Sequence, residues 1–392
     1  MARFPELSVA GNAVPASIFS RLREHLARFP GDVIPFQIGD THLSPPARLE
    51  QLVWAELAPS DLYAYGAAAG WQPLVKAIAE DAQTRRKLDV TPAGIQVTSG
   101  ATHALASTLQ ALCDPGDELL ILTPHWPLIR GIALSINVIP VEVPYFDVAD
   151  PAGRSTSGPA RLEAAITPRT AAIYLASPNN PDGTMLGPAQ LAEIADIAER
   201  HNLWILSDEV YEHYAYEGPH VSMMSLPAAS QRTVTVFSFA KSYALAGLRV
   251  GYALTGNPKL CDTMRKMVNH SVYNVPVAMQ HAALAALREG APFVAAARER
   301  YRAARDRARA RLAAPTSMPS GGAYLWVDFG KWIGNDCMPL LEKIAASGVL
   351  LAPGSSFGAA CGGFARLCFT GVNEARLDEG IDRINAVLAA WS

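Results

Sequence analysis

Lys241 lies in a stretch that favours an unusual chemistry for its amine. The apolar residues 233–237 lead into it, and glycines at 247 and 251 follow. A lysine with apolar neighbours loses solvation of its charged form, so its pKa falls. The neutral amine can attack an aldehyde and form a Schiff base. For this segment alone, a partly buried lysine that pairs with a nearby acid is the alternative.

Two further polar residues stand at the ends of apolar runs. Asp208 follows residues 203–207, and Asn180 lies in the turn Ser-Pro-Asn-Asn-Pro-Asp-Gly at 177–183. Such runs are typical of buried parallel strands, and ligands of open α/β sheets bind beyond the ends of those strands. Taken alone, Asp208 is better explained as a cap of its turn, and Asn180 as a turn residue.

The elements that must position these residues alternate up to about residue 275. Strands are expected at 95–98, 118–122, 137–141, 171–175, 203–207, 233–237 and 249–254, with helices over 102–112 and 188–200 between them. This alternation predicts an α/β domain around a largely parallel sheet.

After residue 275 the pattern changes to that of a smaller α+β unit. Helices are expected over 278–288 and 293–312, and the remaining α+β unit is expected to comprise the segments 323–328, 338–347, 348–352, 364–370 and 374–388. A further helix is expected near the start of the chain, over 17–29. We find no internal repeat and no flexible linker.

The composition argues against several classes of protein. The chain has 392 residues and a net charge of −3, and no basic stripe suggests a nucleic-acid partner. No stretch reaches the ~20 apolar residues of a membrane span, and the first residues do not read as a secretory signal. The five scattered cysteines and nine histidines show no metal-binding spacing, so we expect reduced thiols and a cytoplasmic protein.

The segments around Asn180, Asp208 and Lys241 resemble, in order and spacing, the fold type I pyridoxal-phosphate (PLP) enzymes of the aspartate aminotransferase superfamily, class I/II. The resemblance runs from about Gly39 to Arg366. It implies a large α/β domain over 44–288, with a mostly parallel seven-stranded sheet flanked by helices. It also implies a smaller α+β domain built from both chain ends, residues 1–43 and 289–392.

The resemblance assigns several residues to the ring of pyridoxal 5'-phosphate. Asp208 would pair with the ring nitrogen and keep it protonated, so that the ring stays an electron sink. Asn180 and Tyr211 would bind the ring's 3-oxygen, and Trp126 would stack on the ring. The alternative for Trp126 is a core or interface tryptophan.

The phosphate of the cofactor would be held by a different set of residues. The N-terminus of the helix after residue 98 would present backbone donors to the anion, and a planar guanidinium suits phosphate oxygens. The residues are Gly100, Ala101, Thr102, Ser238 and Arg249. Tyr65 matches a tyrosine that reaches the phosphate of a neighbouring subunit, which implies a homodimer.

On the substrate side, Arg366 matches the arginine that grips the α-carboxylate of an amino acid as a fork. A surface salt bridge is the alternative for Arg366. The backbone at Gly39, and Asn180, would lie near that carboxylate. Lys241, linked to the cofactor as a Schiff base and then freed, would move the α-proton. The implied activity is an aminotransferase acting on an L-amino acid and a 2-oxo acid.

The identity of the amino acid is less constrained. Some aspartate-preferring relatives carry a lysine where Thr102 stands, so we expect a neutral, aromatic or unusual amino acid rather than aspartate. Ser17, Ile18, His42 and Tyr324 are candidates for the side-chain pocket, with ordinary packing as the alternative.

Two other functions stay open from the sequence. The same cofactor residues would serve a C–S β-lyase, a decarboxylase or an amino-acid cyclase or oxidase, because these reactions diverge after a shared carbanion. A ligand-sensing regulator built on this fold is disfavoured, because the chain has no basic N-terminal helix-turn-helix.

Overall fold

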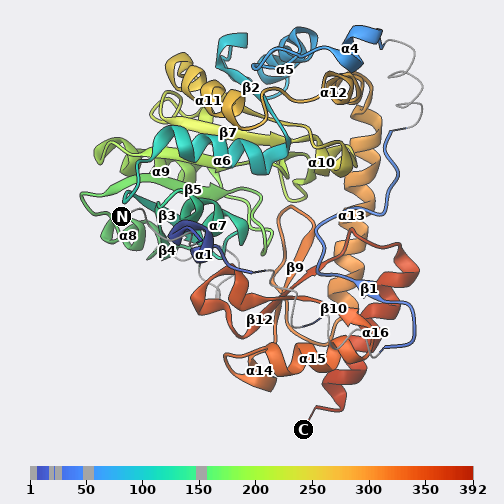
Figure 1. The fold of residues 1–392 in the computed structure, drawn as a ribbon. Coiled ribbons are helices and arrows are strands. Elements are labelled where there is room, and N and C mark those ends of the chain that lie inside the picture. Colours follow the sequence, from blue (N-terminus) through green and yellow to red (C-terminus); the bar gives the residue numbers. More distant parts are fainter. Residues whose placement is uncertain (1–6, 17–21, 23–28, 47–56, 147–156, 392) are drawn as a thin grey trace.

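A seven-stranded sheet forms the centre of the larger part of the molecule (Figure 1). The computed structural model describes residues 7–16, 22, 29–46, 57–146 and 157–391. The strand order is β2-β8-β7-β6-β5-β3-β4, and only β8 runs antiparallel to its neighbours. The strands are β2 (Ile95–Thr98), β3 (Glu118–Thr123), β4 (Ile139–Pro144), β5 (Thr170–Ala176), β6 (Trp204–Asp208), β7 (Thr233–Ser238) and β8 (Gly251–Thr255). The predicted α/β class and mostly parallel sheet are confirmed.

Helices cover both faces of this sheet, which explains why its central strands are largely apolar. Leu119 and Ile121 of β3 pack into one core cluster, whereas Leu120 and Leu122 pack into another. Successive side chains of a strand point to opposite faces, so two covered faces demand a continuous apolar run. The covering helices are α5 (Gln72–Thr84), α6 (Gly100–Leu112), α7 (Leu128–Ser135), α8 (Ser157–Ala164), α9 (Pro188–Arg200), α11 (Pro258–Ser271) and α12 (Val277–Glu289).

The register of the parallel strands brings their carboxyl ends to one edge. Ala176 at the end of β5 lies opposite Asp208 at the end of β6, and Asp208 lies opposite Val236 near the end of β7. The turn at 177–183 and the short helix α10 (Phe239–Ser242) therefore leave the same edge of the sheet, on either side of the end of β6. This edge is where the sequence predicts the ligand.

The smaller part of the molecule is built from both ends of the chain. Near the N-terminus, β1 (Ile34–Pro35) pairs in parallel with β10 (Val349–Leu350). A second sheet has the order β11-β12-β9, with antiparallel pairs of β11 (Ala352–Pro353), β12 (Phe364–Cys368) and β9 (Tyr324–Asp328). Its helices are α14 (Gly330–Ile333), α15 (Met338–Ala346) and α16 (Glu374–Ala389).

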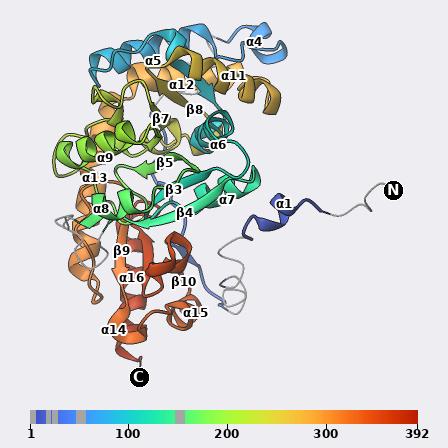
Figure 2. The same cartoon turned by 90° about the vertical axis from the view of Figure 1, so that its left-hand side faces the viewer.

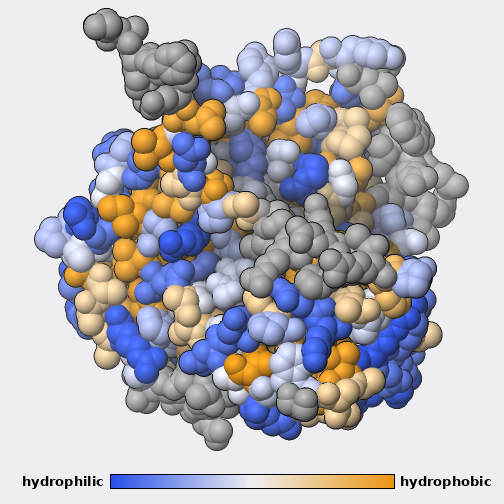
Figure 3. All heavy atoms as spheres, turned by 60° about the horizontal axis from the view of Figure 1, so that its bottom comes forward, coloured by the Kyte–Doolittle hydropathy of each residue, from blue (hydrophilic) through white to orange (hydrophobic). Residues whose placement is uncertain are grey.

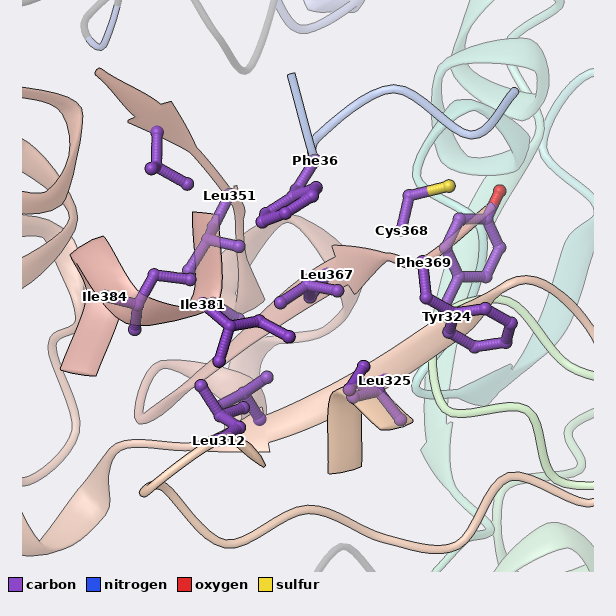
Figure 4. Close-up of a cluster of buried hydrophobic side chains, with 14 of the residues drawn as sticks. Phe36, Leu312, Tyr324, Leu325, Leu351, Leu367, Cys368, Phe369, Ile381 and Ile384 are labelled. Atoms are coloured by element: carbon purple, nitrogen blue, oxygen red, sulfur yellow. The ribbon is translucent and has the colours of Figure 1, made fainter. Parts of the chain in front are cut away.

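A shared core explains why the N-terminal segment belongs with this part. Phe36 is fully buried among Leu325 of β9, Leu367 of β12 and Ile381 of α16 (Figure 4). On the outside, the face drawn in Figure 3 mixes hydrophilic side chains with smaller hydrophobic patches. The domain limits at residues 43/44 and 288/289 remain predictions.

Long α13 (Ala291–Arg311) runs from the sheet-containing part to the smaller part, where it packs beside α16 (Figure 1). Two short helices, α1 (Val9–Ala13) and α4 (Pro59–Tyr63), complete the described elements near the N-terminus, and α1 projects from the body in Figure 2. In the described ranges, no helix is both long and apolar enough to span a membrane. Most of the helix expected at 17–29 lies outside those ranges.

Backbone geometry shifts several predicted strand limits. The expected strand at 137–141 begins at Ile139, because Asn137 adopts a left-handed conformation with φ 63°. Likewise β8 begins at Gly251, because Arg249 has φ 54°. The expected segment 348–352 contains β10 and the start of β11, which join different sheets.

Candidate active site

A cavity of about 220 Å³ lies at the carboxyl ends of β5, β6 and β7. The residues predicted to bind the cofactor or the substrate's α-carboxylate all line it, except Gly100 and Tyr65. The segments that meet there come from the start, the middle and the end of the chain. The lining side chains include an amine, a carboxylate and two guanidinium groups, from Lys241, Asp208, Arg249 and Arg366.

Lys241 projects into the cavity from α10, which β7 places at the edge of the sheet. The hydroxyl of Ser238 caps this helix by accepting a hydrogen bond from the backbone N–H of Ala240 at 3.1 Å. The Lys241 amine donates to the carbonyl of Gly39. Burial lowers the pKa of this amine, and the negative charge of Asp40 opposes the shift. The neutral, nucleophilic form is therefore more accessible than for an exposed lysine.

Asp208 presents a buried carboxylate to the same cavity. It accepts hydrogen bonds from the hydroxyl of Tyr174 at 3.2 Å and from the backbone N–H of Val210 at 3.3 Å. Burial raises the pKa of its carboxyl to about 6. Among the described residues, no cation forms an ion pair with it. A buried carboxylate of this kind is suited to a cationic group of a ligand.

The start of α6 provides the predicted anion site. Gly100 has φ +77°, and a Cβ atom there would lie 2.6 Å from Nη2 of Arg249. Only a glycine therefore allows this guanidinium to approach the helix N-terminus so closely. Arg249 is fixed in turn by donating to the carbonyl of Ala246 at 2.9 Å. Backbone donors, the positive end of the helix dipole and a guanidinium thus converge, which suits a phosphate.

Arg366 is a buried cation without an acidic partner in the described part of the chain. Its Nη1 donates to Oδ1 of Asn180 at 2.8 Å, and its Nη2 donates to the carbonyl of Gln37 at 2.6 Å. Its Nε is buried and has no hydrogen-bond partner. The guanidinium lies 4.2 Å from the ring centroid of Tyr324. Such a group can accept a carboxylate from a ligand as a charge-assisted fork.

Tyr324 has a more central place than the sequence indicated. Its hydroxyl lies 2.5 Å from the hydroxyl of Tyr211, and its ring packs edge-on to that of Tyr211. A Cβ atom on Gly39 would lie 1.9 Å from the Tyr324 hydroxyl, so residue 39 has to be glycine for this contact. A weak signal was available, because Tyr324 opens a strand directly after the glycines at 321 and 322.

Tyr324→Phe is expected to lower kcat by about tenfold with little change in KM, because Tyr211 loses one hydrogen bond while the ring beneath Arg366 remains. Steady-state kinetics of Tyr324→Phe, Tyr211→Phe and the double variant would measure this. We expect the two single effects to be less than additive. A rise in KM at constant kcat would show instead that Tyr324 serves only the carboxylate site.

The other predicted residues differ in their position relative to this cavity. Trp126 follows β3 and lines the cavity, while Tyr65 is 84% exposed and packs against the ring of Tyr273, outside this cavity. His42 donates from Nδ1 to the carbonyl of Thr370 at 2.9 Å and does not line the cavity. The candidates at positions 17 and 18 fall outside the described residues.

Comparisons with known proteins agree with this geometry. The sequence profile of the family described as aminotransferase class I and II matches residues 32–384. The aspartate/prephenate aminotransferase of Thermus thermophilus is 32% identical over 372 residues, covering 91% of each chain. The arginine–pyruvate transaminase of Pseudomonas aeruginosa is 32% identical over 347 residues, covering 86% of this chain and 85% of that protein. A solved single mutant of Thermus thermophilus aspartate aminotransferase matches with a TM-score of 0.90 at 30% identity, covering 98% and 100% of the two chains.

The chain belongs to the aminotransferase class I and II family, within the fold type I PLP enzymes. It is an aminotransferase, which confirms the predicted family and enzyme class. The two relatives above are named for different amino acids, so membership of the family leaves the substrate of this chain open.

Proposed function

We propose that this enzyme moves an amino group between an L-amino acid and a 2-oxo acid, with PLP attached to Lys241 in the 220 Å³ cavity. One observation carries the proposal. Lys241, Asp208 and Arg366 face the same small cavity. The Lys241 amine has a lowered pKa. Among the described residues, the buried carboxylate of Asp208 has no cation paired with it and the buried guanidinium of Arg366 has no acid. An amino acid and a PLP ring carry groups that would complement these three side chains.

The lining residues fit the cofactor group by group. Asp208 suits a protonated ring nitrogen, and Tyr211 and Asn180 suit the ring oxygen beside it. The close approach of Arg249 to Gly100 supports an anion site at the start of α6, where the phosphate would bind. Ala101, Thr102 and Ser238 supply further donors there, and Trp126 would cover a face of the ring.

Bound PLP would supply the electron sink for the bond broken at the α-carbon. The residues of the chain would do the rest. Arg366 would hold the α-carboxylate, and its contact to Asn180 would fix the orientation of the guanidinium. Lys241 Nζ would take the proton from the α-carbon, which its lowered pKa favours. The Gly39 carbonyl, now bonded to Nζ, would hold the amine near that carbon.

We further propose that the active unit is a homodimer in the cytoplasm. The support for a second copy is Tyr65, which is exposed and does not line its own cavity, as a residue that serves a partner's phosphate would be. The free thiols of Cys113, Cys261, Cys337, Cys361 and Cys368 are in keeping with a reducing compartment. Sedimentation of the PLP-loaded enzyme would test the assembly.

The amino donor is proposed to be an amino acid other than aspartate, since Thr102 stands where a cation would be needed. Spectroscopy of the PLP-loaded protein tests the reaction. L-Amino acids are added singly, and the amino form of the cofactor and a 2-oxo acid are followed. An L-amino acid that yields both the amino form of the cofactor and a 2-oxo acid supports the proposal. Pyruvate and ammonia would indicate a lyase, carbon dioxide a decarboxylase and oxygen uptake an oxidase.

Arg366→Ala is expected to raise KM for the amino acid by about a hundredfold or more, because a charge-assisted fork to the α-carboxylate is lost. Cofactor retention should change little, because Arg366 contacts no residue of the phosphate region. Arg376→Ala, at a half-buried, ion-paired arginine of α16 outside this cavity, is the control and should leave KM unchanged. An unchanged KM in Arg366→Ala would place the carboxylate elsewhere.

A further inference from the structure

A second, larger cavity opens from the candidate active site. Its volume is about 1090 Å³, and it shares Gly39, Trp126 and Arg366 with the smaller cavity. A substrate whose carboxylate lies on Arg366 therefore sits at the junction of the two. With the cofactor in the smaller cavity, the larger one is the space left for the substrate's side chain.

The walls of this larger cavity expose apolar side chains that a folded protein ordinarily covers. Val14, Ile38 and Leu128 line it and are 39%, 51% and 56% exposed. The ring systems of Trp126 and Phe357 complete the apolar lining. Large apolar side chains gathered in one concave site are typical of a binding surface for an apolar group.

The two most exposed of these residues are held in place by buried neighbours. Leu128 begins α7, and the next residue, Ile129, is fully buried beneath it. Ile38 lies two residues after the core residue Phe36 and immediately before Gly39, which bonds to Lys241. Their backbones are therefore fixed while their side chains remain open, so a ligand could bind them without an ordering penalty.

The charges in the cavity work against an acidic side chain. Besides Arg366, the charged residues among the described part of its lining are Arg130 and Glu142. Nη1 of Arg130 lies 3.4 Å from Oε1 of Glu142, and Oε2 of Glu142 accepts the backbone N–H of Ala359 at 2.9 Å. The neighbouring ring of His125, whose Nε2 lies 3.6 Å from Oε1 of Glu142, and these contacts lower the pKa of Glu142 to about 2, so it stays ionised. A distal carboxylate would meet a fixed negative charge and a cation that is already paired.

A substrate with a cationic side chain would also gain little binding energy here, because Arg130, which lies beside Glu142, would repel the cation. We infer that the amino-acid substrate has a large apolar side chain, aromatic or branched, that packs on Leu128 and Ile38. This inference rests on the proposed function and names the substrate class for that site. Arg130 and Glu142 act as determinants that exclude dicarboxylic amino acids.

Binding of unreactive carboxylates to the PLP-loaded enzyme tests the inference without relying on turnover. Calorimetry would compare phenylpropanoate, which carries an aromatic group, with succinate, which carries a second carboxylate. We expect phenylpropanoate to bind at least about tenfold more tightly. In Leu128→Ser and Ile38→Ser its affinity should fall by about tenfold, while that of succinate stays constant. Val272→Ser, at an apolar residue that is 43% exposed outside this cavity, is the matched control.

Glu142→Gln tests the role of charge. It removes the fixed negative charge and leaves Arg130 without an acidic partner in the cavity, so succinate should bind about tenfold more tightly, with phenylpropanoate little changed. An unchanged ratio of the two affinities would contradict the proposed exclusion of dicarboxylates.

Three results would overturn the inference. The first is tighter binding of succinate, or of guanidinovalerate, than of phenylpropanoate by the wild-type enzyme. The second is an unchanged affinity ratio in both serine variants. The third is dissociation of the assembly by Leu128→Ser, seen by sedimentation, without a change in that ratio, which would assign Leu128 to contacts between copies. If aspartate is the best amino donor, only the substrate class fails; if no L-amino acid reacts, the proposed function fails.

Discussion

Lys241→Ala is expected to reduce amino transfer by more than about a thousandfold, because it removes both the cofactor's attachment point and the proton carrier. The fold should persist. In the described structure the Lys241 amine makes one hydrogen bond, to the Gly39 carbonyl, and its burial disfavours its charged form. The melting temperature should therefore stay the same or rise slightly.

Turnover with an amino acid and a 2-oxo acid, measured beside the melting temperature, checks this expectation. Lys259→Ala is the matched control, because Lys259 is an exposed lysine on α11 and should be dispensable. Turnover of Lys241→Ala within tenfold of the wild type would be incompatible with Lys241 as the reacting amine.

Asp208→Asn is expected to change stability and cofactor binding in opposite directions. Burial raises the pKa of this carboxyl to about 6 in the folded, cofactor-free protein. The folded state then binds a proton more readily than the unfolded state, so the free energy of unfolding falls as pH rises from about 4 to about 6. Above that pH window the folded protein bears the full free-energy cost of burying the ionised Asp208 carboxylate. Asp208→Asn removes this cost and should stabilise the cofactor-free protein by up to about 3 kcal/mol.

The same substitution should weaken PLP binding by about a hundredfold, since a neutral amide no longer pairs with a protonated ring nitrogen. Melting temperatures of the cofactor-free proteins at pH 5 and pH 7.5, with PLP titrations at pH 7.5, would measure both effects. The stability gain should shrink at pH 5, where Asp208 of the wild type is largely protonated. A lower melting temperature at pH 7.5 together with unaltered PLP affinity would show that Asp208 serves the fold alone.

The parts of the site that follow local signals could be predicted from the sequence. Asp208, Asn180 and Lys241 each come after an apolar run, and parallel strands bring the ends of such runs to one edge. Their convergence on one cavity is what the pattern indicates, although the role of each residue stays a proposal.

Long-range contacts set the remainder of the site, and no local pattern reports them. Gly39 and Arg366 lie at opposite ends of the chain and meet because the segment at Phe36 packs beside β12, where the Cys368 N–H donates to the Phe36 carbonyl at 2.8 Å. Long-range pairing likewise divides residues 349–353 between two sheets, because β10 pairs with β1 whereas β11 pairs with β12. Only the resemblance to a known family anticipated that Gly39 and Arg366 share a site.

The position of Leu128 in a cavity could not be predicted from the sequence, for a different reason. It begins α7, a helix of eight residues that sequence patterns did not indicate. An exposed leucine there looks like an ordinary surface residue until the fold places it beside Ile38 in one cavity. Residues that determine which substrate binds can thus be harder to find than those that hold a shared cofactor.

The most direct test of the proposed site is to find where PLP becomes attached. The PLP-loaded protein would be treated with borohydride, which fixes an imine to its lysine, then digested and analysed by mass spectrometry. We expect the reduced cofactor on the peptide that contains Lys241, and on no other lysine. Modification of a different lysine, or none after full loading with PLP, would contradict the proposal that Lys241 holds the cofactor.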